Sequence, residues 1–126
     1  MSAKLGIKPG ATIALVNAPA GFDGLLGPLP GVSVRRRLGG RFDVIVCFLG
    51  RRRDLERRIE SVPAALQPDG GLWLAWPKRS SGVATDLDET VLREVVLPTG
   101  LVDNKVCAID ATWSGLRFVW RRELRA

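Results

Sequence analysis

Phe42-Asp43-Val44-Ile45-Val46-Cys47-Phe48-Leu49 is the most apolar run of the chain, and it decides the fold class. A continuous apolar run of this length predicts a strand that is buried on both faces in the middle of a parallel sheet. Two further runs of the same kind are Thr12–Val16, which follows the turn Lys8–Gly10, and Leu72–Trp76. Three such strands indicate an α/β protein, because both faces of a parallel sheet need covering layers.

Helical segments are expected between these strands. The longest is predicted over about residues 52–66, where apolar residues recur at helical spacing and form one stripe: Leu55, Ile59, Val62 and Leu66. Pro63 should kink this helix or end it near Ser61, after which it would restart. A short helix is expected from about Pro19 or Ala20 to Leu26.

A third helix is predicted from Thr85 to Val96. Thr85, with Asp88 three residues later, has the pattern of a helix N-cap. Asp86, Asp88 and Glu89 would then lie in the first helical turn, where the helix dipole favours carboxylates. This position explains the acidic cluster without any chemistry.

The remaining segments complete the sheet. Residues 32–36 alternate as an edge strand does, and residues 67–71 are expected to form a turn. Two strands, 103–109 and 116–122, are joined by a short connection and should add an antiparallel hairpin at the edge. In the last strand the core-facing positions should be Leu116, Phe118 and Trp120, with Arg117, Val119 and Arg121 on the other face.

The predicted architecture is therefore a single α/β domain spanning residues 1–126. It is a three-layer, Rossmann-like fold with a mostly parallel sheet of about six strands and a C-terminal antiparallel hairpin. A chain of 126 residues has no room for a second hydrophobic core. Asp103 and Lys105 would point to the same side of a strand and could pair.

The composition excludes several chemistries. The chain has no histidine and no tyrosine, so nucleophile systems that use an imidazole base are absent. Its only cysteines, Cys47 and Cys107, lie in apolar runs and are expected to be buried and reduced. Two lone cysteines cannot complete a zinc site. We therefore expect no metal site, and any acid–base chemistry would fall to Asp, Glu, Lys or Cys. No cofactor and no catalytic residue are predicted.

The net charge is +6, and all of the excess lies in residues 1–60. It is concentrated in Arg35–Arg37, Arg41, Arg51–Arg53 and Arg57–Arg58. Such clusters could bind anionic ligands or nucleic acid, or could simply be solvated. Aromatic residues are not interleaved with these arginines, which disfavours nucleic acid. No apolar run is long enough for a membrane helix and the N-terminus has no secretion signal, so a cytoplasmic, bacterial-type protein is expected.

The predicted order of elements resembles that of the class I S-adenosylmethionine-dependent methyltransferases. The matching segments are Lys8–Gly10 before the first strand, residues 42–46, the turn Leu66–Gly71, and the C-terminal hairpin. This resemblance covers nearly the whole chain and implies the fold. In that family a glycine-rich loop after the first strand lets the cofactor approach the backbone.

The chain departs from that family at the cofactor site. The loop after the first strand is Asn17-Ala18-Pro19-Ala20-Gly21, which keeps one glycine and gains a proline that has no N–H to donate. The second strand ends in Arg35–Arg37, where the resemblance implies an acidic residue for the ribose hydroxyls. The chain is also shorter by about one strand–helix unit.

A second resemblance is more specific. The whole chain resembles a family of small bacterial proteins classed as a domain of unknown function. The segments that carry it are Leu15–Pro19, Trp76–Lys78, Ser81–Gly82, Val102–Val106 and Trp113–Phe118. This resemblance implies the fold but no activity, cofactor or catalytic residue.

Ligands of open α/β sheets bind outside the carboxyl ends of the strands, where the strand order reverses. That edge predicts these candidate ligand-binding residues: Asn17, Gly21, Arg52, Trp76, Lys78, Arg79, Ser80, Ser81 and Trp113. The loop Pro77–Gly82 is the best functional candidate, because two cations and two hydroxyls would suit a phosphate or carboxylate. Asn17 more often caps a following helix in such a position, and that reading is favoured. Trp73, Trp76 and Trp120 should pack in the core, whereas Trp113, in the hairpin turn, could line a pocket or a protein interface.

These observations favour a binding protein over an enzyme. We expect a non-catalytic, Rossmann-like protein that recognises an anionic small molecule or a protein partner at the carboxyl edge of its sheet. One alternative is a reduced S-adenosylmethionine-dependent methyltransferase. Another is a nucleic-acid-binding protein that uses the N-terminal arginines. A homodimer is a further expectation, and no membrane association is expected.

Overall fold

Six strands form one sheet in the computed structural model, which describes residues 1–125. The strands are β1 (Thr12–Val16), β2 (Ser33–Arg35), β3 (Phe42–Phe48), β4 (Leu66–Pro77), β5 (Leu101–Ala108) and β6 (Trp113–Trp120). Their order across the sheet is β2-β1-β3-β4-β6-β5. The pairs among β1 to β4 are parallel, and β6 runs antiparallel to both of its neighbours. The predicted mixed sheet is confirmed, although the reversed strand lies inside the sheet and β5 forms the edge.

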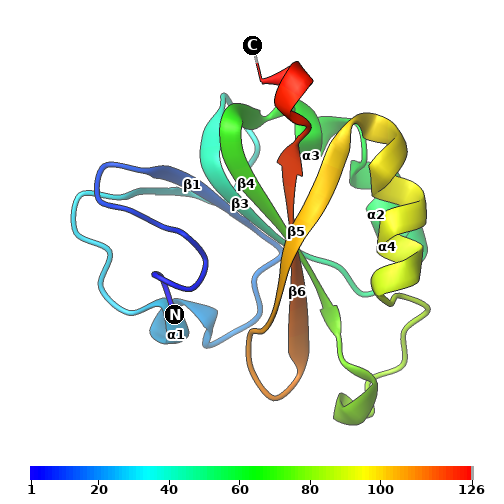
Figure 1. The fold of residues 1–126 in the computed structure, drawn as a ribbon. Helices are drawn as coiled ribbons and strands as arrows, with labels where there is room; N and C mark the ends of the chain where they lie inside the picture. Colours follow the sequence, from blue (N-terminus) through cyan, green and yellow to red (C-terminus); the bar gives the residue numbers. More distant parts are fainter. Residues whose placement is uncertain (126) are drawn as a thin grey trace.

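The sheet is the middle of three layers (Figure 1). The helices are α1 (Phe22–Leu26), α2 (Arg52–Arg58), α3 (Ser61–Ala64) and α4 (Glu89–Val96), with 3₁₀ turns at Arg79–Ser81, Leu97–Thr99 and Arg122–Leu124. One face is covered by α2, α3 and α4, and the other by α1 and the N-terminal segment, residues 1–8 (Figure 1). No helix among residues 1–125 has the length and hydropathy needed to cross a bilayer.

The helix-covered face follows the predicted apolar stripe. Leu55, Val62 and Leu66 are buried and Ile59 packs against the same cluster. The predicted interruption is real, since α2 ends at Arg58 and α3 begins at Ser61. Pro63 lies in the short α3, where its missing N–H is tolerated because a helix this short forms few internal hydrogen bonds.

The opposite face is covered mainly by irregular chain. Leu5 and Ile7 of the N-terminal segment are buried against the sheet, together with Phe22 and Leu26 of α1. The indole Nε1 of Trp73, a fully buried side chain of β4, donates a hydrogen bond of 3.0 Å to the Leu5 carbonyl. One buried side-chain hydrogen bond therefore ties the N-terminal segment to the centre of the sheet.

Two predicted boundaries are wrong because contacts with distant segments override the local pattern. Residues 67–71, expected as a turn, belong to β4, and the register with β3 shifts between Phe42 and Val44 to accommodate them. Thr85 is not the helix cap, because α4 begins only at Glu89; the Thr85 hydroxyl donates to the Gly50 carbonyl at 2.6 Å and accepts from the Leu87 N–H at 3.1 Å. The N-cap of α4 is Asp88, whose carboxylate accepts from the Val91 N–H.

The C-terminal hairpin is confirmed with shifted ends. Leu116 and Phe118 are buried on the helix-covered face with Trp120 packed beside them, as the alternation predicts. Asp103 does not pair with Lys105; it accepts a 3.2 Å hydrogen bond from the Arg93 guanidinium of α4. The sheet register is irregular between Asp103 and Lys105, which removes the simple alternation that the pairing required.

Candidate functional site

The carboxyl ends of β1, β3 and β4 meet at one edge of the sheet, as predicted (Figure 1). The segments that follow them carry seven of the nine candidate residues, and Trp76 lies near the end of β4 itself. Trp113 joins the same edge because it begins β6 and pairs with Pro77 at the end of β4. The structure thus brings the predicted loops together, and the contacts of each side chain show what it can do there.

The loop after β1 is exposed and contains little helix. Asn17 adopts a left-handed conformation with φ of 56° and is exposed. It does not cap α1, as had been favoured, because the N-cap is Gly21 with φ of 89° and no side-chain cap bond. Since α1 has only five residues, it presents one turn rather than an extended helix N-terminus. The Asn17 side chain is consequently available at the edge.

An exposed ion pair connects α1 to the segment just after β2. Arg36, just after β2, contacts Asp23 of α1 with a nitrogen–oxygen distance of 2.7 Å. The methyltransferase resemblance implies a carboxylate for a ribose in this region, but the carboxylate present comes from α1 and is paired with an arginine. The neighbouring Arg35 and Arg37 are exposed and form no ion pair within residues 1–125.

Arg52 links two helices. Its guanidinium contacts Glu56 of α2 at 3.4 Å and Glu94 of α4 at 3.3 Å. Its backbone N–H donates to the Asp86 carboxylate at 2.8 Å, so Asp86 satisfies a free N–H at the start of α2. Arg52 therefore has acidic partners already, whereas Arg51 and Arg53 have none within residues 1–125.

The loop after β4 folds on itself. The Ser81 hydroxyl donates to the Lys78 carbonyl at 2.6 Å and accepts from the Val83 N–H at 3.2 Å. The Lys78 N–H donates to the Thr112 carbonyl at 2.7 Å, which fastens the loop to the hairpin. Ser81 is thus committed to loop structure, while Arg79 and Ser80 remain exposed.

A pocket of about 450 Å³ lies beside this loop. Buried Trp76 and exposed Arg79 line one part, and Asp86, Asp88 and Glu89 line another. Two of these carboxylates each use one oxygen to satisfy a helix N-terminus. The pocket is therefore more acidic than the loop sequence alone suggests, because the chain folds the start of the next helix against it.

Trp113 packs within the protein rather than projecting from a turn. Its ring meets Phe48 edge-on, with centroids 5.1 Å apart and an interplanar angle of 89°. Phe48 in turn meets Phe22 at 4.9 Å. The Asp110 carboxylate accepts a hydrogen bond of 2.8 Å from the backbone N–H of Trp113 and so shapes the hairpin turn. The half-buried indole completes the core under α1.

Both cysteines are buried thiols, as expected, and they lie on opposite faces of the sheet. Burial raises the pKa of the Cys47 thiol to about 11. Burial also raises the pKa of Cys107 on β5. Neutral thiols are poor nucleophiles, so neither cysteine has the lowered pKa of a catalytic group.

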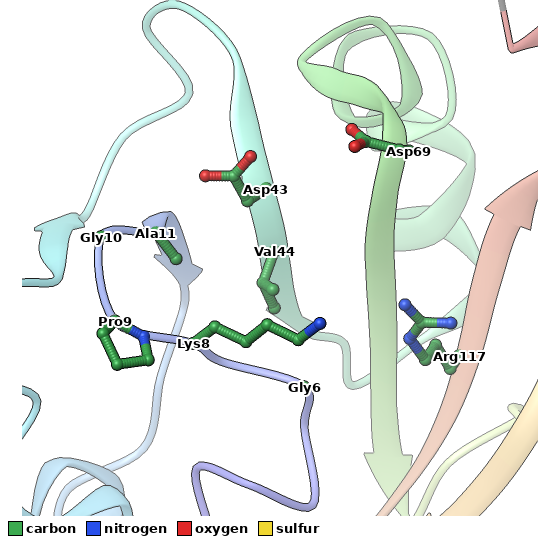
Figure 2. Close-up of a pocket in the computed structure, with 9 residues that line it drawn as sticks. All are labelled: Gly6, Lys8, Pro9, Gly10, Ala11, Asp43, Val44, Asp69 and Arg117. Atoms are coloured by element: carbon green, nitrogen blue, oxygen red, sulfur yellow. The ribbon is translucent and has the colours of Figure 1, made fainter.

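A second pocket, of about 380 Å³, lies near the amino ends of β1, β3 and β4, and Figure 2 shows it. Its charged residues are Lys8, Asp43, Asp69 and Arg117. Sequence reasoning placed Arg117 on the face away from the helices but did not join it to the N-terminal segment. The alternation along β6 was the only sequence signal for Arg117, because the other residues that line this pocket come from distant parts of the chain.

Comparison with solved structures finds methyltransferases. The match to the ribosomal protein L11 methylase of Lactobacillus delbrueckii subsp. bulgaricus has a TM-score of 0.64 at 13% identity and covers 95% of this chain and 74% of that chain. A magnesium protoporphyrin IX methyltransferase of Synechocystis PCC 6803 matches with a TM-score of 0.65 at 12% identity, covering 90% and 75%. A putative type 11 methyltransferase of Sulfolobus solfataricus matches at 0.64 and 13%, covering 96% and 89%.

These matches show that the chain has the Rossmann-like fold of class I methyltransferases. No protein-family model matches the chain, and no curated protein matches its sequence. The resemblance to a bacterial family of unknown function consequently stays a prediction. Residues 36–41 connect β2 to β3 without a helix, and the shortening by one strand–helix unit relative to that family stays a prediction.

Proposed function

We propose that this protein is a non-catalytic binding protein with a methyltransferase fold, and that it recognises an anionic ligand at the carboxyl edge of its sheet. The observation that carries the proposal is the arrangement of two arginine clusters, Arg35–Arg37 and Arg51–Arg53. They follow β2 and β3, the two neighbours of β1, and so flank the end of β1 where the strand order reverses. Four of these six arginines, Arg35, Arg37, Arg51 and Arg53, have no acidic partner within residues 1–125. Unpaired arginines at a ligand-binding edge suit phosphate or carboxylate groups.

The same region argues against ordinary use of S-adenosylmethionine. The loop after β1 has Pro19, which donates no N–H, and it leads to a helix of five residues. The end of β2 carries Arg36, held by Asp23, in place of a free carboxylate. Function resides in a site rather than in a fold. The arginines of this site favour an anionic ligand, whereas binding of ribose hydroxyls would call for a free carboxylate.

The second candidate is a reduced S-adenosylmethionine-dependent methyltransferase, and the fold comparisons favour it over the first. The three structures named above are methyltransferases or methylases, and the Synechocystis enzyme is described with S-adenosylhomocysteine bound. In this reading the cofactor would lie beside Asn17 and Gly21, and the pocket beside Trp76 would take the methyl acceptor. The site residues, rather than the fold, lead us to rank it second.

Thermal unfolding separates the two candidates. A ligand that binds only the folded protein raises Tm by mass action. We expect tripolyphosphate to raise Tm at constant ionic strength and neither S-adenosylmethionine nor S-adenosylhomocysteine to do so. A Tm increase with S-adenosylhomocysteine, together with methyl transfer, would establish the second candidate and overturn the first.

A quadruple variant tests the arginines themselves. Replacing Arg35, Arg37, Arg51 and Arg53 by glutamine should abolish the tripolyphosphate shift, because it removes the unpaired guanidiniums of the edge. Arg121→Gln with Arg122→Gln is the control. Both residues are exposed, and they follow the end of β6 that is opposite to the carboxyl edge. An unchanged shift in the quadruple variant would contradict the proposal.

Nucleic acid binding is the remaining alternative for these arginines. Phosphate contacts make such binding fall steeply with salt. We expect no retention of single-stranded RNA at physiological ionic strength, and strong, salt-sensitive retention would replace the small-molecule ligand by a polyanion. The predicted homodimer also remains a proposal, and sedimentation equilibrium measures it directly.

A further inference from the structure

Arg117 of β6 is a charge without an acidic partner, within residues 1–125, on the face that the N-terminal segment covers. It is partly buried, and it forms no ion pair or side-chain hydrogen bond within residues 1–125. Burial is the main cause that lowers the pKa of its guanidinium, with a smaller contribution from Arg125. A partly desolvated cation without a partner costs free energy, which an anion would offset.

The backbone provides a seat for this guanidinium. A Cβ at Gly71 of β4 would lie 2.7 Å from both Nε and Nη2 of Arg117. The guanidinium therefore lies flat against the strand at a position where only glycine leaves room for it. The absence of a side chain at Gly71 leaves the space that this position of the guanidinium requires.

Other cations converge on the same place. Lys105 of β5 is paired directly with Arg117 across the antiparallel ladder. Like charges directly opposite each other destabilise a strand pair unless something neutralises them. Lys4 and Asn104 line the small pocket, of about 220 Å³, that Lys105 and Arg117 share.

Lys8 approaches from the other side. Figure 2 shows its side chain extending from the N-terminal segment across β3 toward the side where the Arg117 guanidinium lies. Two carboxylates also line this pocket. Asp43 accepts a 2.8 Å hydrogen bond from the Thr12 N–H, and Asp69 lies exposed at the upper end of the view. Neither forms an ion pair with Lys8 or Arg117.

We propose that Arg117, Lys105 and Lys8 bind a phosphate-type anion of a small molecule on this face, with Gly71 as the backbone seat of the guanidinium. The two hollows, of about 380 and 220 Å³, meet at Gly6 and Arg117. An anion there contacts Arg117 from either hollow. It also neutralises the two positive charges of Lys105 and Arg117, which lie directly opposite each other. Asp69 offers an acceptor to hydroxyl or amine groups on the rest of the ligand. This site lies away from the carboxyl edge and is independent of the function proposed above.

Calorimetric titration of the full chain with pyrophosphate, at constant ionic strength, tests the site. Arg117→Gln should weaken binding about tenfold or more, because it removes a charge-assisted hydrogen bond to the anion. Arg117→Lys should restore only part of the affinity, since it keeps the charge but not the fork. Arg121→Gln, a nearby exposed arginine, should leave the affinity unchanged.

Gly71→Ala is the sharper variant, since it removes no charge. Its methyl group would displace the guanidinium from its seat, and we expect the same loss of pyrophosphate affinity as in Arg117→Gln. The double variant Lys8→Gln with Lys105→Gln keeps the test open if Arg117 variants fold poorly, and it should also lose affinity. Tighter binding of ADP than of pyrophosphate would identify the ligand as a nucleotide, and equal binding would identify the phosphates as the recognised group.

Two results would overturn the proposal. One is wild-type protein that binds pyrophosphate no better than chloride of the same ionic strength. The other is an affinity that survives in both Arg117→Gln and the lysine double variant. The glutamine variants of the carboxyl-edge arginines leave this site intact, so failure here and failure of the proposed function are distinguishable.

Discussion

The two faces of the sheet are covered in different ways, by helices on one side and mainly by irregular chain on the other. The helix-covered face has α2, α3 and α4 packed on a continuous apolar cluster. The opposite face has one short helix and the N-terminal segment, residues 1–8, fixed by buried Leu5 and Ile7. Regular helices satisfy their own backbone groups and can cover a sheet closely. An irregular segment covers less, and on this face it leaves the hollows beside Arg117.

The first prediction compares one leucine from each face. Leu92→Ala in α4 should lower the free energy of unfolding by about 2–5 kcal/mol, because it opens a cavity in the main cluster. Leu5→Ala should cost less, since the N-terminal segment can detach without unfolding the sheet. Urea unfolding of both variants measures the two losses. Equal losses would show that the segment belongs to the cooperative core, and the comparison of faces would fail.

The second prediction concerns the hydrogen bond that ties the segment to the sheet. Trp73→Phe leaves the Leu5 carbonyl without its donor, and we expect a loss of about 1–3 kcal/mol. Native-state hydrogen exchange should show faster exchange in residues 1–8 than in α4. Trp76→Phe, on the helix-covered face, serves as the control and should leave exchange in residues 1–8 unchanged. Uniform acceleration across the whole chain would mean that the bond does not act locally.

The third prediction tests the start of α4 on the helix-covered face. Asp88→Ala should lower the free energy of unfolding by about 1 kcal/mol, because the Val91 N–H loses its cap. Thr90→Ala, an exposed position in the same helix, is the matched control. A smaller loss in Asp88→Ala than in the control would place the cap elsewhere, for example at Thr85 as the sequence suggests.

The smallest expected effect is a difference in reaction rate between the two thiols, which lie on opposite faces of the sheet. Cys107, on the edge strand, should react faster with a thiol reagent than Cys47, which is fully buried in the helix-covered cluster. Single-cysteine variants, Cys47→Ala and Cys107→Ala, assign the two rates in the folded protein. A faster reaction at Cys47 would show that the helices open more readily than the segment does.

The pH dependence of stability follows from the same burial. The folded pKa of Cys47 is raised to about 11 from an ordinary value of 9.0, so the folded state keeps its proton where the unfolded state loses it. This contribution to stability is complete below pH 9.0 and is lost as the pH rises toward 11. Cys47→Ala should flatten the decline over that interval in urea unfolding, and an unchanged slope would contradict the assignment.

Much of the fold could be predicted because the signals are local. The runs around Val46 and Leu74 identified the buried parallel strands, and the stripe from Leu55 to Leu66 identified the helices that cover one face. The errors arose where a tertiary contact overrides a local pattern. Thr85 looks like a cap, but its hydroxyl bonds to Gly50 of another loop. Residues 67–71 look like a turn, but they form an irregularity inside β4, because β3 pairs with Leu66 before them and with Gly71 at their end.

The candidate site was predicted less well than the fold. The sequence correctly assigned Arg52, Trp76 and Arg79 to the carboxyl edge, because that edge follows from strand order. It could not show that Arg52 is paired with Glu94, or that Asp86 faces the loop of Arg79. Those partners are separated along the chain, and no periodicity connects them.

By itself, the sequence determined the α/β class, the faces of the strands and the arginine-rich first half, since these depend on residue type and short-range spacing. Only the tertiary structure decided which charges are compensated. Arg36 gains Asp23, Arg93 gains Asp103, and Arg117 gains no acidic partner within residues 1–125. The physical reason is that a charge interacts with whatever the fold brings within a few ångströms, and that proximity is set by packing rather than by sequence separation.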